Sequence, residues 1–133
     1  MSGKPPQLNK RPIHLGLGAT AEVEPEFTGE MSWYEGYGAR HGSDGVEARL
    51  VSMHTFTEDW DVWEMHPKGA EVVLCTAGTM ELVQELNGEE VITAVSAGEY
   101  AINQPGTWHT ANVSSSATAV FITAGEGTTH RPR

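Results

Sequence analysis

The sequence has 133 residues, of which 18 are acidic and 8 are basic, and its formal net charge is −10. A chain of this length forms one domain that buries about two-thirds of the surface of its unfolded form. The negative charge argues against binding to nucleic acids or anionic membranes, because both require basic patches. The single cysteine, Cys75, excludes an intramolecular disulfide and is expected in the core. No apolar run reaches the length of a membrane span or signal peptide, so the expected setting is cytoplasmic.

Residues 1–44 are expected to lack regular structure and to pack against the rest of the domain. Residues 1–20 contain three prolines and few large apolar side chains, which is typical of an arm that is free or lies across a partner surface. Glycines interrupt residues 21–44, which nevertheless carry too much aromatic surface to leave in water. The aromatic residues of this segment are Phe27, Trp33, Tyr34 and Tyr37. We expect them to be covered by the domain or by a second subunit.

From residue 45 onward the pattern is that of successive strands. Turn signals recur about every 8 to 12 residues and no long segment has a helical period, which predicts an all-β sandwich or barrel over residues 45–125. Asn87-Gly88 is a strong hairpin signal, because both residues tolerate positive φ. Residues 126–133 are expected to form a polar tail. The expected strands cover residues 48–56, 60–66, 71–76, 79–86, 89–95, 100–103, 108–113 and 117–124.

Two distant segments supply candidate metal ligands. In the strand expected at residues 60–66, a period of two places Glu64 and His66 on the same face of the sheet. Glu71 opens an otherwise apolar strand, where a buried carboxylate is costly unless it is paired, hydrogen-bonded or bound to a metal. His109 follows the turn at residues 104–106. Imidazole and carboxylate ligands on a rigid sheet suit a divalent transition metal.

The same segments resemble the two motifs of the cupin superfamily, and the resemblance covers about residues 45–124. The first motif is matched by the spacing of His66, Glu71 and Gly78, and the second by that of Gly98, Gly106 and His109. The resemblance implies a small double-stranded β-helix, which is a jelly-roll barrel. It also implies one divalent metal ion, with Fe, Mn, Zn and Ni as candidates, held by a two-histidine, one-carboxylate face that leaves positions open for dioxygen or substrate.

The sequence departs from the family pattern most importantly at Glu64, which stands where the first motif usually has its first histidine. If Glu64 binds the metal, two carboxylates neutralise the ion and favour Mn²⁺, Fe²⁺ or Zn²⁺. If Glu64 stands back, a coordination position opens and Glu64 becomes a candidate general base. A bulge in the strand would instead direct it outward. Three smaller departures affect turns more than chemistry: Glu58 at a glycine position, Gln104 at a proline position and Val113 at an asparagine position.

Four residues are candidates for substrate binding, namely His54, Met80, Gln84 and Ile102. His54 lies among apolar residues of the preceding strand, and Gln84 shares its strand parity with Met80. The expected pocket is therefore small and partly apolar. The remaining histidines have no partner at ligand spacing and are expected to be solvated: His14, His41 and His130.

Three functions remain compatible with these residues. The first is a metal-dependent enzyme that acts on a small oxygen-containing organic molecule as a dioxygenase, isomerase or cyclase. The second is a non-catalytic module that binds or senses a metal or a small ligand. The third is a scaffold that has lost its metal, against which the retention of His66, Glu71 and His109 argues. A homodimer is expected, because small cupins often pair their sheets and because the aromatic N-terminal segment needs cover.

Overall fold

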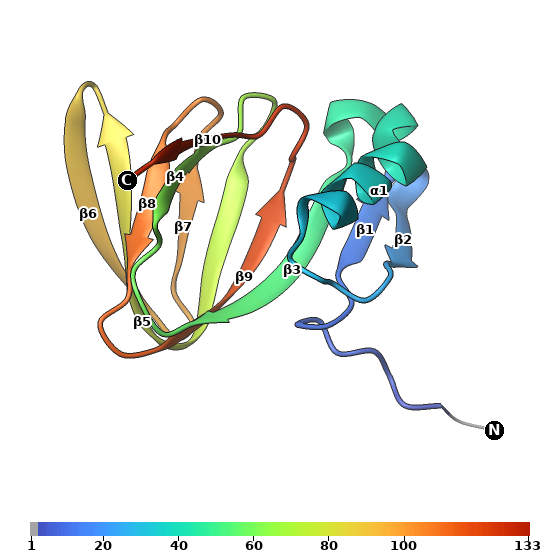
Figure 1. Ribbon diagram of the computed structural model, residues 1–133, viewed down its shortest axis with the longest axis horizontal. Coiled ribbons are helices and arrows are strands. Elements are labelled where there is room, and N and C mark those ends of the chain that lie inside the picture. Colours follow the sequence, from blue (N-terminus) through green and yellow to red (C-terminus); the bar gives the residue numbers. More distant parts are fainter. Residues whose placement is uncertain (1–2) are drawn as a thin grey trace.

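Within residues 3–133, ten strands form one continuous antiparallel sheet that folds back on itself as a two-layered barrel (Figure 1). The computed structural model describes residues 3–133, so the first two residues of the expected N-terminal arm lie outside the described part. The all-β prediction is confirmed. The strands are β1 (Ile13–Gly16), β2 (Thr20–Val23), β3 (Arg49–Phe56), β4 (Val62–Met65), β5 (Glu71–Leu86), β6 (Glu89–Ser96), β7 (Tyr100–Asn103), β8 (His109–Asn112), β9 (Ala117–Thr123) and β10 (Thr129–Pro132).

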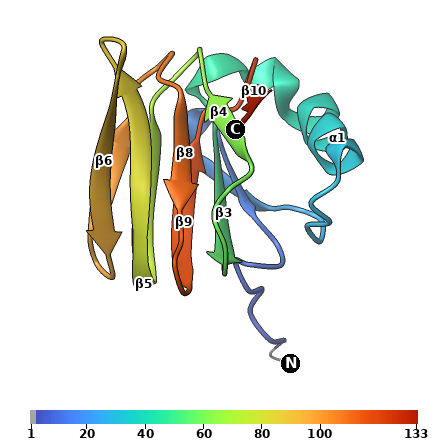
Figure 2. The same cartoon turned by 60° about the vertical axis from the view of Figure 1, so that its left-hand side comes forward.

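Strand β5 belongs to both layers of the barrel. Its first half pairs with β7 and β9, and β9 continues through β3 to the β1–β2 hairpin. Its second half pairs with β6 and β8, and β8 continues through β4 to β10 (Figure 2). Between the two halves the pairing with β9 shifts register at Cys75/Ala77. The sequence predicts two strands separated at Ala77-Gly78, and the structure instead has one long strand with an irregularity there.

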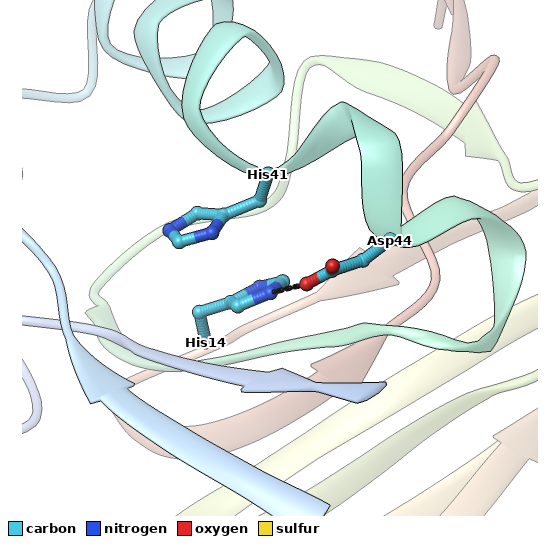
Figure 3. A group of neighbouring side chains, drawn as sticks. All are labelled: His14, His41 and Asp44. Atoms are coloured by element: carbon cyan, nitrogen blue, oxygen red, sulfur yellow. Dashed lines mark hydrogen bonds and ion pairs between the residues drawn. The ribbon is translucent and has the colours of Figure 1, made fainter. Parts of the chain in front are cut away.

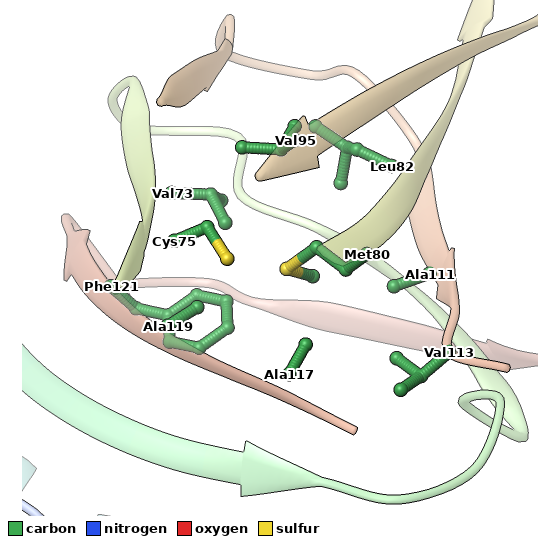
Figure 4. Close-up of a cluster of buried hydrophobic side chains, with 10 residues drawn as sticks. All are labelled: Val73, Cys75, Met80, Leu82, Val95, Ala111, Val113, Ala117, Ala119 and Phe121. Carbon is green, nitrogen blue, oxygen red and sulfur yellow. The ribbon is translucent and has the colours of Figure 1, made fainter. Parts of the chain in front are cut away.

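The space between the two layers is filled by a hydrophobic core to which both contribute (Figure 4). Cys75 is fully buried in this core, as the sequence analysis expected. Inward and outward side chains alternate along each strand. The inward positions near one end of the barrel lie outside this core and can form a polar site. The core residues are Val73, Cys75, Met80, Leu82, Val95, Ala111, Val113, Ala117, Ala119 and Phe121.

The N-terminal segment is more regular than the sequence indicated. Helix α1 (Met31–His41) and the short 3₁₀ helices η1 (Leu17–Ala19) and η2 (Gly42–Glu47) lie beside β1 and β3 (Figure 1). Helix α1 buries Trp33, whose indole N–H donates to the carbonyl of Pro25 at 3.2 Å. Among residues 3–133 no helix has the length and apolar character needed to cross a membrane.

The C-terminal residues also contribute to the barrel. The predicted polar tail contains β10, which pairs antiparallel with β4 and places His130 opposite Glu64. The guanidinium of Arg131 in β10 lies over the rings of Trp63 and Trp108, at 5.1 and 4.4 Å from their centroids. Strand β4, which precedes the first predicted ligand motif, is therefore held between β8 and β10.

Candidate metal centre

Three of the four predicted ligands meet inside the barrel. His66 follows β4, Glu71 is the first residue of β5 and His109 is the first residue of β8, and all three are buried. The Nε2 atoms of His66 and His109 lie 3.2 and 3.3 Å from the two oxygens of the Glu71 carboxylate. One donor atom from each residue lies within 4.8 Å of the others, a separation that one metal ion can bridge.

The hydrogen bonds around the two imidazoles leave both Nε2 atoms with a lone pair. His109 Nδ1–H donates to the carbonyl of Thr107 at 3.1 Å, because a carbonyl can only accept. Thr128 donates its hydroxyl proton to the carbonyl of Gly125 at 2.8 Å, so its oxygen accepts from His66 Nδ1–H, also at 2.8 Å. Neither Nε2 makes a hydrogen bond with any described residue, although both are fully buried. Two buried, unpaired lone pairs directed at one carboxylate fit a divalent metal.

The Glu71 carboxylate is fixed by two further donors. Asn103 Nδ2 donates to Oε1 at 3.1 Å, and Thr123 Oγ1 donates to Oε2 at 2.6 Å. Gln84 Nε2 in turn donates to Asn103 Oδ1 at 2.8 Å. Polar partners of this kind orient first-shell ligands in metal sites. The sequence analysis did not single out Asn103 or Thr123. The signal available for Asn103 was a polar residue at an inward position of an apolar strand.

In the metal-free protein, the interactions among these residues shift the pKa values of Glu71 and His109. Burial on its own would raise the pKa of Glu71, but the neighbouring His109 and His66 side chains hold that pKa well below its ordinary value. Burial likewise opposes protonation of His109, yet the Glu71 carboxylate raises the pKa of His109 above its ordinary value. The carboxylate is thus ionised over the whole neutral range, which is the form that binds a metal.

Glu64 lies close to this group without joining it. It pairs across the strands with His109 in β8, so its side chain faces the same interior. Its Oε1 atom is 3.3 Å from Nε2 of His130, and its side chain is about one-quarter exposed. Glu64 also lines the cavity that opens above His66 and Glu71. This position puts a carboxylate in the cavity wall beside the three converging ligands.

The cavity above His66 and Glu71 has a volume of about 590 Å³ and a mixed wall of aromatic, polar and acidic side chains. His54 in β3 lines it, and burial lowers the pKa of His54, so its imidazole is neutral. The aromatic residues of the wall are Phe27, Tyr34, Phe56, Trp60 and Phe121. Phe27 and Tyr34 come from the N-terminal segment, which therefore covers part of the site.

The other predicted substrate contacts lie elsewhere. Met80 is fully buried in the hydrophobic core, and Gln84 holds Asn103. Ile102 points to the outside of β7 and is 42% exposed. Of the four, the structure brings only His54 to the cavity above the ligands.

Two of the histidines that were expected to be solvated are in fact enclosed. His14 is 0% exposed and lies under α1 and η2, and the side chain of His41 is 12% exposed. The expectation was wrong for His14 because the sequence did not reveal the helix that covers it. His130 is about half exposed and contacts Glu64.

Comparisons with known proteins identify the fold. No protein-family profile matches the sequence, and no curated protein does. A double-stranded β-helix protein from Klebsiella pneumoniae superposes with a TM-score of 0.54 and 24% identity, over 64% of this chain and 76% of that one. Oxalate oxidase in complex with the substrate analogue glycolate gives a TM-score of 0.52 and 18% identity, over 61% of this chain. The match spans 45% of the oxalate oxidase chain, less than half its length. The fold expected from the two motifs is confirmed, and the chain has a double-stranded β-helix fold.

Proposed function

We propose that this protein is a metal-dependent cupin enzyme that acts on a small oxygen-containing organic molecule. The observation that carries the proposal is the pair of buried Nε2 lone pairs, on His66 and His109, directed at the ionised Glu71 carboxylate. Without a cation these polar atoms are left unsatisfied, which is costly inside a protein. A divalent metal satisfies all three at once.

The ligand set favours a divalent transition metal. Two neutral imidazoles and one carboxylate match Fe²⁺, Mn²⁺, Zn²⁺ or Ni²⁺ better than Mg²⁺ or Ca²⁺, which prefer oxygen ligands. A metal held by three protein ligands on one face would supply Lewis acidity and open positions for oxygen atoms of a bound molecule. The cupin fold also carries the oxalate oxidase structure, but at 18% identity that likeness supports the fold and not its reaction.

The substrate that we propose is a small, partly apolar molecule with a carbonyl, enol or carboxylate oxygen. The mixed wall and the volume of about 590 Å³ suit a molecule of this size and polarity. Its oxygen would approach the metal ligands at the floor of the cavity. The neutral His54 lies in the same wall and is available to accept or donate a hydrogen bond.

We propose turnover rather than storage because proton-accepting groups share the cavity with the metal ligands. Glu64 lines the cavity together with His66 and Glu71, which places it to take a proton from a bound molecule. Such a proton transfer is compatible with isomerase, cyclase and dioxygenase reactions. In this role Glu64 is a base and not a ligand.

Metal analysis tests the first part of the proposal. Purified protein expressed in metal-replete medium should contain about one equivalent of a transition metal per chain by elemental analysis. His109→Ala should lose the metal, because it removes one of three ligands. Glu64→Gln should retain it. A wild-type content below about a tenth of an equivalent would remove the metal proposal.

Turnover tests the second part. We expect the loaded protein to exchange protons with, or consume oxygen in the presence of, one class within a panel of β-diketones, enols and keto acids. Glu64→Gln should retain binding of that compound and lose at least about 100-fold in rate, as expected for removal of a general base. Full metal content with binding but no turnover across the panel would favour a binding module instead.

A further inference from the structure

A second cluster of ligand-type side chains lies outside the barrel, beneath the N-terminal helix. His14 comes from β1, His41 is the last residue of α1 and Asp44 lies in η2 (Figure 3). Their candidate ligand atoms lie within 4.8 Å of one another, as do those of His66, Glu71 and His109. His14 Nε2 is 2.7 Å from Asp44 Oδ2. The side chains of His14, His41 and Asp44 are 1%, 12% and 28% exposed.

Each imidazole of this cluster is held by an oxygen at its other nitrogen. His14 Nδ1 is 2.6 Å from the Tyr37 hydroxyl, and His41 Nε2 is 2.8 Å from Glu24 Oε2. The Tyr37 hydroxyl orients the His14 ring in the way that outer partners orient metal-binding histidines. His14 Nε2 faces Asp44, and Glu22 Oε2 lies 3.7 Å from His41 Nδ1.

The carboxylates around the cluster have too few cationic partners to balance their charge. Arg40 pairs with Glu24 at 2.8 Å and balances that buried carboxylate. Among residues 3–133, the only ion-pair partner of Asp44 is His14, and the only one of Glu22 is His41. Two carboxylates facing two imidazoles form a set that a divalent ion such as Zn²⁺ neutralises.

Gly16 packs closely against two of the ligand atoms. A Cβ atom on Gly16 would lie 2.7 Å from Thr20 Oγ1, 2.9 Å from Asp44 Oδ2 and 3.1 Å from His14 Nε2, so a side chain at this position would crowd the cluster. His14 and His41 also line a cavity of about 720 Å³ under α1, which gives an entry path. An entry path is one of the requirements for a metal site.

We propose that His14, His41 and Asp44 form a second divalent-cation site, with Glu22 as an additional carboxylate, that ties α1 and η2 to β1. The site is independent of the ligands in the barrel and extends beyond the proposed catalytic function. In the metal-free protein His14 Nε2–H donates to Asp44, because a carboxylate only accepts. When the cation binds Nε2, that proton leaves to solvent and Nδ1 takes one up, so the ring stays neutral and Nδ1–H donates to the Tyr37 hydroxyl oxygen.

Binding at this site includes a rearrangement. The rings of His14 and His41 stack with their centroids 3.7 Å apart and an interplanar angle of 15°, so their in-plane lone pairs run side by side. The His41 ring must turn about its Cβ–Cγ bond before both nitrogens reach one ion. We therefore expect this site to bind more weakly than the site in the barrel, whose ligands already converge.

Calorimetric titration of the chelator-treated full chain with Zn²⁺ tests the proposal. We expect a tight and a weaker binding event of one equivalent each. Asp44→Asn and His41→Gln should weaken only the second event, by at least about 10-fold. Asp44→Asn preserves the shape of the side chain, and Ser43→Ala is the neighbouring control that should keep both events. Circular dichroism confirms that each variant is folded.

The titration also separates this proposal from the one for the barrel. His109→Ala, or Glu71→Gln if that variant is better folded, should lose only the tight event. A single event that His109→Ala abolishes would overturn the second site, as would a weak event unchanged in both Asp44→Asn and His41→Gln. If the wild type shows only the weak event, the barrel site is overturned and this one is not.

Discussion

His66 takes its orientation from a residue more than sixty positions away in the chain. Thr128 both accepts from His66 Nδ1–H and donates to the Gly125 carbonyl, which locks the imidazole in the tautomer that leaves Nε2 free. His66, Glu71 and His109 could be predicted from their spacing, because the motif places them at strand ends. Thr128 could not, because its role depends on where β10 pairs and no pattern in the tail reveals that.

Replacement of Thr128 should therefore weaken metal binding without removing a ligand. Thr128→Val keeps the side-chain volume but removes the acceptor for His66 Nδ1–H, and we expect the metal affinity to fall about 10- to 100-fold. Thr128→Ser should restore most of it. Competition with a chromogenic chelator measures the affinity, and Thr129→Val, one residue along β10, is the control. Equal affinities for the valine variant and the wild type would exclude a positioning role.

Gly78, the last residue of the first cupin motif, owes its identity to a close contact as well as to its backbone. Its φ is +72°, and an added Cβ would lie 2.1 Å from the carbonyl oxygen of Ser116. Gly98 also has a positive φ, +87°, but has open space where its Cβ would be. The left-handed conformation alone costs a non-glycine residue about 1–2 kcal/mol.

Gly78→Ala should accordingly destabilise the protein more than Gly98→Ala. We expect a loss of about 1–2 kcal/mol in the free energy of unfolding for Gly98→Ala, and a loss of more than about 2 kcal/mol for Gly78→Ala, because the clash adds to the backbone strain. Urea unfolding followed by circular dichroism measures both. Similar losses in the two variants would show that the chain near Ser116 moves aside easily.

At the scale of elements, the sequence revealed the strands better than the additions at either end of the chain. The Asn87-Gly88 hairpin between β5 and β6 was predicted and is present, because its turn chemistry is local. Helix α1 was not predicted, since it is short and contains two residues of low helix propensity, Gly36 and Gly38. Trp33 of this helix packs against Phe27, with the ring centroids 5.1 Å apart, and local patterns do not encode such tertiary packing.

Strand β10 was not predicted for a related reason, because its stability comes from the guanidinium of Arg131 and not from alternating apolar residues. Arg131 lies over Trp63 and Trp108 and pairs with Glu85. The guanidinium is partly exposed, so each of these contacts contributes modestly. Together they attach β10, which contains His130 and follows Thr128, to the strand that carries Glu64.

Removal of the guanidinium should loosen this attachment. Arg131→Ala should lower the free energy of unfolding by about 1–2 kcal/mol, and Arg131→Lys by less, since an ammonium keeps the charge but cannot stack in the same way. Chemical unfolding followed by tryptophan fluorescence reports directly on the two rings. Lys68→Ala, at an exposed loop cation, is the control and should have little effect. An unchanged stability in Arg131→Ala would mean that backbone pairing alone holds β10.

At the scale of the whole molecule, the outer face of the layer formed by β7, β5, β9, β3 and β1 differs from the rest of the surface. The chain carries 18 acidic residues, yet none lies at the described outward positions that pair across this face, which are apolar except for Arg49 opposite Leu15 and Thr55 opposite Thr118. Tyr100 is 65% exposed there. Depletion of charge with retention of aromatic and aliphatic side chains is typical of interface cores. The residues are Tyr100, Ile102, Val72, Leu74, Val120, Ile122, Met53, Val51, Ile13 and Leu15.

We propose that a second copy of the chain covers this face, as expected for a homodimer. A two-fold interface brings the same patch of both subunits together. A patch without acidic residues can meet itself with little repulsion, whereas two acidic surfaces of a chain with net charge −10 repel each other. Light scattering at micromolar concentration should give the mass of a dimer. Ile122→Asp, at the centre of the face, should shift it to the monomer, because it buries two unpaired carboxylates at the axis. Ile92→Asp, on the exposed side of β6 in the other layer, should remain dimeric. A monomeric wild type would exclude the dimer. A dimer that Ile92→Asp disrupts and Ile122→Asp does not would place the contact elsewhere.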